Sequence, residues 1–366
     1  MKPFEQFIGQ MLESARRVQA RDPAAATDII QQALARAGLL TPQPQADAQA
    51  QAAPAFVDLN QPPAWSKSRA KAGPHPGAGE AARLPGRFIA GSHACAAGSR
   101  RYKLYIPAHQ SAGPRPLIVM LHGCTQDPDD FALGTGMNAL AEQAGCLVLY
   151  PGQDGSANRN RCWNWFEPGH QAREAGEPAI IAGMTRQVMR DHDIDPAQVF
   201  VAGMSAGGAM AAVLGAEYPD LFAAIGVHSG LAAGSARDMI SGLQAMKKPG
   251  RARSLREAVP AIVFHGDADH VVSPANGEAV LNQFIGAHAG LRATPLQADQ
   301  AESTQGGRRS TRRTWRDDAG RTMAEHWTLH GAGHAWAGGN AAGSHTDALG
   351  PNASREMLRF FLTENR

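Results

Sequence analysis

Short apolar runs alternate with amphipathic stretches along most of the chain after residue 86. Residues 117–121 (Leu-Ile-Val-Met-Leu) form a continuous apolar run, which is typical of a central parallel strand covered on both faces. Comparable runs occupy residues 146–150, 199–202, 224–227 and 261–264, and residues 101–106 alternate as a half-exposed strand does. Helical periodicity separates most of these runs, at about residues 129–144, 179–192, 206–218 and 276–289. This alternation predicts an α/β fold with a doubly wound, mostly parallel sheet.

The region before residue 87 has a different pattern. Residues 4–37 carry apolar side chains at helical spacing, which predicts two short amphipathic helices. Residues 41–86 are rich in Pro, Ala, Gln and Gly, and such a composition buries too little apolar surface to offset the entropy lost on ordering. We therefore predict an amphipathic helical segment at 1–40, a flexible low-complexity linker at 41–86 and the α/β domain at 87–366.

Composition and charge narrow the range of partners. The formal net charge of the 366 residues is only +2, and the basic runs at 247–256 and 308–316 are typical of solvated faces, so we expect no nucleic-acid partner. We expect no transmembrane segment, and no secretory signal is visible, which favours a cytoplasmic protein. The four cysteines, Cys95, Cys124, Cys146 and Cys162, lack metal-finger spacing and allow three full pairings. We expect neither a metal nor another cofactor.

The strongest chemical motif follows the apolar run at 199–202. Residues 203–208 (Gly-Met-Ser-Ala-Gly-Gly) lie where a predicted buried strand ends and an Ala-rich helix begins. A serine on such a tight turn is lifted above the sheet edge, and the flanking glycines tolerate the crowding of a sharp turn. Ser205 is therefore predicted to be a nucleophile, and the amide of Ala206 directly after it an oxyanion donor.

An activated serine needs a base, and the base needs an orienting acid. After the apolar run at 261–264 come two rivals for the acid, Asp267 and Asp269, and later a Gly-rich loop carries His334. The order Ser, Asp, His is the one that α/β sheets of this type use. His334 is the predicted base, whereas His265 and His330 are predicted to be structural.

Two further segments are candidates for contacts with a reacting ester. Residues 121–126 (Leu-His-Gly-Cys-Thr-Gln) follow an early strand, so the amide of Cys124 is a candidate second oxyanion donor, although the segment could simply end the strand in a turn. An irregular insertion holds Trp163 and Trp165, and Trp336 follows His334 closely. These tryptophans are predicted to bind substrate; the alternative is a hydrophobic cluster that anchors a long loop.

Together these motifs resemble the esterase, poly(3-hydroxybutyrate) depolymerase family. The resemblance rests on residues 121–126, 162–165, 203–208, 265–272 and 333–339. It implies an α/β-hydrolase fold and a Ser205–Asp269–His334 triad, and it selects Asp269 through the form H-G-x-x-D-x-x-V. It also implies a disulfide between Cys124 and Cys162, and leaves Cys95 and Cys146 unassigned.

The resemblance implies a serine esterase that forms an acyl-enzyme. The expected substrates are hydroxyalkanoate oligomers or amorphous polyester, and the alternatives are feruloyl or acetylxylan esters, which related enzymes cleave. An alternative of another class is a granule- or surface-binding protein with a vestigial site. Residues 1–40 are candidates for docking on a polymer granule or for self-association. Members of the family are often exported, which is at odds with the cytoplasmic location that the sequence favours.

Overall fold

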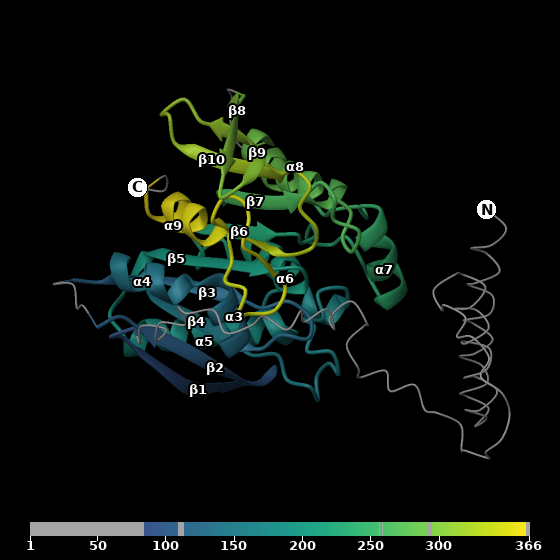
Figure 1. Cartoon of the computed structure of the whole chain (residues 1–366). Coiled ribbons are helices and arrows are strands. Elements are labelled where there is room, and N and C mark those ends of the chain that lie inside the picture. Colours follow the sequence, from purple (N-terminus) through teal and green to yellow (C-terminus); the bar gives the residue numbers. More distant parts are fainter. Residues whose placement is uncertain (1–83, 109–112, 256, 258, 291–294, 364–366) are drawn as a thin grey trace, which may run out of the picture. The chain divides into compact units, whose positions relative to one another are not determined.

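The computed structural model describes residues 84–108, 113–255, 257, 259–290 and 295–363 (Figure 1). The helical segment predicted at 1–40 lies outside these residues, as does the predicted linker at 41–86 apart from Leu84–Gly86. No helix in the described ranges has the length and apolar character needed to cross a membrane.

A ten-stranded sheet organises the described domain. Its order is β1-β2-β4-β3-β5-β6-β7-β10-β9-β8, parallel from β4 to β10 and antiparallel at both edges. The strands are β1 (Arg87–Cys95), β2 (Gly98–Ile106), β3 (Arg115–Leu121), β4 (Leu147–Pro151), β5 (Ile194–Met204), β6 (Ala224–His228), β7 (Ala261–Gly266), β8 (Gln297–Gln305), β9 (Arg308–Arg316) and β10 (Thr322–Leu329). A small parallel pair, β11 (Trp336–Ala337) and β12 (Thr346–Asp347), lies outside this sheet.

Helices cover both faces of the sheet, because alternate strand residues point to opposite sides. Leu117 and Val119 belong to one buried cluster, whereas Ile118 and Met120 belong to the other. The first cluster includes residues of α5 (Gly176–Asp191), α6 (Ala206–Glu217), α7 (Met239–Lys247) and α8 (Ala275–Gly290). The second includes residues of α3 (Pro128–Thr135), α4 (Met137–Ala144) and α9 (Ala353–Thr363). The predicted doubly wound, mostly parallel α/β sheet is therefore confirmed (Figure 1).

Two details differ from the sequence prediction. The single helix predicted at 129–144 is two helices, because Gly136 adopts φ 62°, a left-handed conformation that ends α3 and starts α4. The basic run at 308–316 is strand β9, paired with β8 and β10, and its Ser310 and Thr314 are buried.

The carboxyl ends of the central strands meet at one edge of the sheet. Leu121 of β3 pairs in register with Gly203 of β5, and Met204 pairs with His228 of β6. His228 in turn pairs with Phe264 of β7. Open α/β sheets place their ligands at this edge, and every predicted catalytic residue follows one of these strands or β10.

Candidate active site

Ser205 occupies a strained turn between β5 and α6. Its φ of 55° and ψ of −118° lie outside the regions that ordinary residues favour. The neighbouring glycines are sterically required, because a Cβ on Gly207 would approach Leu121 O to 2.1 Å and one on Gly203 would approach Gly207 O to 2.4 Å. The chain therefore forms the sharp elbow that the motif predicts, at the N-terminus of α6.

His334 and Asp269 meet at the same edge of the sheet, in the loops after β10 and β7. Nδ1 of His334 lies 2.7 Å from Oδ2 of Asp269. Oδ1 of the same carboxylate accepts hydrogen bonds from the amides of Val271 and Val272, both at 2.9 Å. Burial opposes ionisation of Asp269, but hydrogen bonds from His265 and His334 outweigh it and hold the pKa of Asp269 below its usual range. The carboxylate is thus charged and fixed in orientation.

The rival acid, Asp267, has a different partner. Its Oδ2 lies 2.9 Å from Nδ1 of His330, and its Oδ1 accepts the amide of Gly331 at 2.6 Å. Asp267 and Asp269 therefore each bind a separate histidine of the loop after β10. His330 also lies 2.8 Å from Thr311 Oγ1, which suits the structural role predicted for it.

His265 is closer to the acid than the sequence suggested. Its Nε2 lies 3.0 Å from Val272 O and 3.4 Å from Asp269 Oδ2, while its side chain is buried at the end of β7. Nε2 must carry the proton to donate to the carbonyl, so its N–H also faces the carboxylate. The signal was present in the sequence, since His265 opens the H-G-x-x-D segment.

The segment predicted to supply an oxyanion donor lies against Ser205. A Cβ built on Gly123 would stand 3.6 Å from Ser205 Cβ, an ordinary van der Waals contact, which places this segment next to the nucleophile. Gly123 N donates to Gln126 Oε1 at 3.0 Å, and Thr125 N donates to Asn160 O at 2.6 Å. The amide of Cys124 lies between these two anchored positions.

Cys124 is also covalently anchored, because it forms a disulfide with Cys162. This confirms the predicted pairing and ties the segment beside Ser205 to the insertion that follows β4. Of the two free cysteines, Cys95 is exposed, whereas Cys146 is buried.

One disulfide, one exposed thiol and one buried thiol predict a stepwise thiol titration of protein purified under oxidising conditions. Native protein should expose one reactive thiol, Cys95, because burial raises the pKa of Cys146 to about 12 and suppresses its thiolate. Denatured protein should show two thiols, and denatured, reduced protein four, as measured with a chromogenic disulfide reagent. Four thiols before reduction would refute the bridge.

The three tryptophans predicted to bind substrate are buried instead. Trp163, Trp165 and Trp336 expose 0%, 7% and 1% of their surface. Trp163 Nε1 donates to His122 O at 3.1 Å, and Trp336 Nε1 donates to Ser354 Oγ at 3.1 Å. Their burial, and the internal hydrogen bonds of Trp163 and Trp336, favour the alternative of a hydrophobic cluster that anchors the loop.

Two buried histidines that the sequence analysis did not single out hold the site together. His228 O accepts the Ser205 amide at 2.9 Å, and His228 Nε2 accepts the Ala337 amide at 3.1 Å, so this residue joins the elbow to the loop after His334. His122 Nε2 accepts the Gln153 amide at 3.1 Å, and its Nδ1 lies 2.8 Å from Gly123 O. Both residues end or follow a buried strand at the catalytic edge, which is the signal that could have found them.

Their neutrality predicts a pH-dependent stability. Burial lowers the pKa of His122 to about 4 and that of His228 to about 3. Below about pH 6.5 these two histidines become protonated in the unfolded chain but stay neutral in the folded protein. The free energy of unfolding therefore falls as the pH drops toward the folded pKa values. Each histidine should lower the free energy of unfolding by about 2 kcal/mol when the pH falls from 7.5 to 5.0.

Urea unfolding at these two pH values measures the effect. His228→Asn is expected to be less stable than wild type at both pH values. On acidification, its free energy of unfolding should fall by about 2 kcal/mol less than that of wild type. An identical loss in variant and wild type would show that His228 is not neutral in the fold.

Among the described residues, no group of three or more His, Cys, Asp or Glu is arranged to hold a metal ion. The elements present are a serine on a strained strand–helix elbow, a buried carboxylate on a loop histidine, and a tethered loop beside the serine. The fold is that of the α/β-hydrolases, and this constellation stands at the edge where that fold carries its chemistry.

Comparison with known proteins identifies the family. Residues 100–306 match the family described as Esterase PHB depolymerase, and the chain belongs to this family. It is 34% identical over 244 residues to poly(3-hydroxyalkanoate) depolymerase C of Paucimonas lemoignei, covering 63% of this chain and 57% of the relative. It is 30% identical over 289 residues to poly(3-hydroxybutyrate) depolymerase of Ralstonia pickettii, covering 71% and 57%. The chain thus spans somewhat over half the length of these curated relatives.

A solved structure supports the fold. An acetyl xylan esterase from Aspergillus awamori superimposes with a TM-score of 0.56 over 72% of this chain and 93% of that chain, at 22% sequence identity.

Proposed function

We propose that the protein is a serine carboxylic ester hydrolase that acts through an acyl-enzyme. The observation that carries the proposal is the 2.7 Å contact between His334 Nδ1 and the buried Asp269, at the sheet edge that also carries the strained Ser205 elbow. Because Nδ1 of His334 carries a proton, Nε2 is free to act as a base. Nε2 takes the proton from Ser205 Oγ as that oxygen attacks the ester carbonyl.

The backbone around Ser205 supplies the stabilisation that the attack needs. The tetrahedral intermediate carries negative charge on the former carbonyl oxygen, and the amides of Ala206 and Cys124 are the proposed donors to it. Ala206 is the first residue of α6, whose N-terminal dipole favours the same charge. The disulfide and the anchored neighbours of Cys124 hold its amide in place before the reaction begins.

His334 then protonates the leaving alcohol, and an acyl group remains on Ser205. Water enters in the second half of the cycle, when His334 deprotonates it and the attack on the acyl carbon releases the carboxylic acid. Asp269 holds the tautomer and stabilises the imidazolium in both halves, and His265 contacts the same carboxylate oxygen, Oδ2, at 3.4 Å.

The proposed substrates are hydroxyalkanoate oligomers or amorphous polyester, in keeping with the two depolymerases to which the chain is similar. The test is a panel of soluble 3-hydroxybutyrate oligomers, amorphous polymer particles, ethyl ferulate and acetylated xylan, assayed with the purified chain. Hydroxybutyrate oligomers should be cleaved with the highest kcat/KM. A higher value for ferulate or xylan would reassign the enzyme to the carbohydrate esterases, and no cleavage of any ester would refute the proposal.

A further inference from the structure

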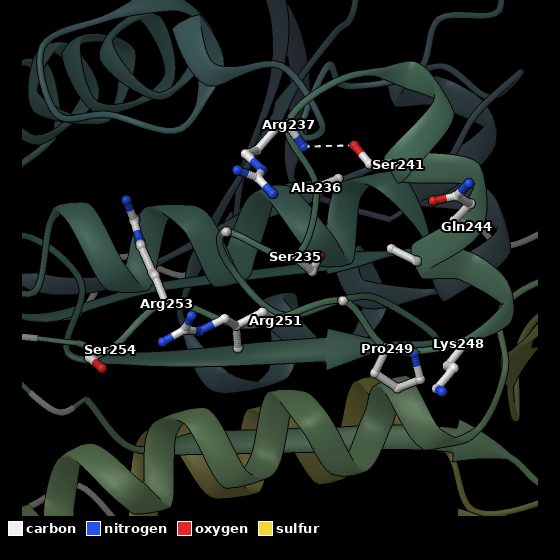
Figure 2. Close-up of a pocket in the computed structure, with 14 residues that line it drawn as sticks. Ser235, Ala236, Arg237, Ser241, Gln244, Lys248, Pro249, Arg251, Arg253 and Ser254 are labelled. Carbon is white, nitrogen blue, oxygen red and sulfur yellow. Dashed lines mark hydrogen bonds between the residues drawn. The ribbon is translucent and has the colours of Figure 1, made fainter.

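A pocket of about 710 Å³ lies beside α7, and none of the groups that the proposed ester hydrolysis uses lines it. Its volume falls in the range of small-molecule sites. Four cationic side chains, those of Arg237, Lys248, Arg251 and Arg253, line it, and the described lining residues include no carboxylate. Figure 2 shows these side chains arranged around the pocket, with α7 along one side.

Three of these four cationic side chains form no direct ion pair in the described structure. Arg253 pairs with Glu217 and donates Nη1 to Gln171 O at 2.9 Å. Arg237, Lys248 and Arg251 form no ion pair with any described residue. Asp238, the N-cap of α7, accepts the Ser241 amide at 2.7 Å and keeps its negative charge, which offsets part of the charge of Arg237. Like charges gathered in one concave place repel one another, and a bound anion relieves this repulsion.

A buried hydroxyl adds a second feature of a ligand site. Ser235 is only 8% exposed and lines the pocket, yet its Oγ has no hydrogen-bond partner among the described residues. A buried polar group without a partner costs free energy, so its retention needs an explanation. An oxyanion in the pocket would accept the missing hydrogen bond.

The floor of the pocket is rigidly built. Gln283 of α8 donates Nε2 to Ala233 O at 2.9 Å and to Arg253 O at 2.8 Å, which joins the two segments that form the floor. The segments touch so closely that a Cβ on Gly250 would stand 1.9 Å from Ser235 O. The polar groups are therefore positioned before any ligand arrives, which lowers the entropic cost of binding.

The Arg253 side of the pocket is remote from the nucleophile. Arg253 pairs with Glu217, the last residue of α6, whereas Ser205 directly precedes the first residue of that helix. A helix of 12 residues rises about 18 Å at 1.5 Å per residue. A ligand held at Arg253 therefore lies about one helix length from the reacting ester.

We propose that this pocket binds a small molecule that carries two or more oxyanion groups, phosphate or carboxylate. The guanidinium groups of Arg237 and Arg251 each offer a planar fork of N–H donors that suits such groups, and Lys248 adds a point charge. The hydroxyl of Ser235 donates the remaining hydrogen bond. The basic side chains surround a compact pocket and do not form a long stripe, so the pocket suits a small molecule better than a nucleic acid.

Isothermal titration calorimetry of the full chain at low ionic strength tests this site without reference to ester hydrolysis. The probes are tripolyphosphate for phosphate ligands, citrate for carboxylate ligands, and a short single-stranded oligonucleotide. At least one small anion should bind with 1:1 stoichiometry. Binding of tripolyphosphate alone assigns phosphate groups to the ligand, and binding of citrate of equal or greater strength assigns carboxylates.

Matched variants locate the binding. Arg237→Gln/Arg251→Gln is expected to weaken the bound probe at least tenfold, whereas Arg190→Gln/Arg309→Gln, an equal loss of charge at exposed positions outside the pocket, should leave its affinity within twofold. Ser235→Ala should weaken binding several-fold, with a urea midpoint no lower than that of wild type because it removes a buried hydroxyl without a partner. The proposal is overturned if neither small anion binds, if the first double variant binds like wild type, or if only the oligonucleotide binds.

Discussion

Replacing Ser205 by alanine is expected to lower kcat/KM for a soluble ester by a factor of ~10³ or more, because the remaining site has no nucleophile to form the acyl-enzyme. The fold should survive, since alanine removes only the Oγ atom, and no side-chain hydrogen bond of Ser205 caps α6. Initial rates of p-nitrophenyl butyrate hydrolysis, measured with far-UV circular dichroism on the same preparation, give both quantities.

The matched control is Ser229→Ala, which removes another hydroxyl from a buried residue with positive φ at the same sheet edge. It should retain activity within about an order of magnitude, because Ser229 contacts His228 and not the reacting ester. Substantial ester cleavage by well-folded Ser205→Ala protein would remove the serine from the mechanism.

Asp269→Asn should be the second crippling change, with a loss of roughly 10³ to 10⁴ in kcat. The asparagine amide can present its N–H₂ to His334 Nδ1, which favours the tautomer with the proton on Nε2 and so removes the base. Initial rates of p-nitrophenyl butyrate hydrolysis measure this loss.

Asp267→Asn is the internal control for this change, since it makes the same substitution two residues away in the same loop. Its partner is His330 and not His334, so its kcat should fall by less than about tenfold. If Asp267→Asn were the crippling variant and Asp269→Asn nearly silent, the assignment of the acid would be wrong.

The sequence predicts the central sheet well because its strands are buried on both faces. Runs such as residues 117–121 must then be apolar throughout, and they stand out against their surroundings. The Ser205 elbow is equally visible, since its geometry demands glycine at Gly203 and Gly207, where any side chain would meet backbone.

The outer elements were missed for the opposite reason. Strand β8 (Gln297–Gln305) is almost wholly exposed and polar, so it carries no apolar signal, and its partner β9 is dominated by arginine. A local signal was nevertheless present: Gly306 and Gly307 have φ of 51° and 77° in the turn between these strands, and paired glycines are typical of hairpins.

The sequence does not predict the direction in which the side chains at the site point. Tryptophan is equally suited to a substrate wall and to a core, and only the three-dimensional structure shows that Trp163 and Trp336 are covered by their neighbours. The supporting role of His228 depends on contacts with residues distant in sequence, Ser205 and Ala337, which no local pattern encodes.

The most direct test of the central claim is covalent labelling with a fluorophosphonate, followed by mass spectrometry of the labelled peptide. An activated serine reacts with this probe, whereas an ordinary serine does not. The account predicts a single adduct on Ser205 and a rate of labelling that falls by at least a hundredfold in His334→Ala. No adduct, an adduct on another residue, or equal labelling of His334→Ala and wild type would contradict it.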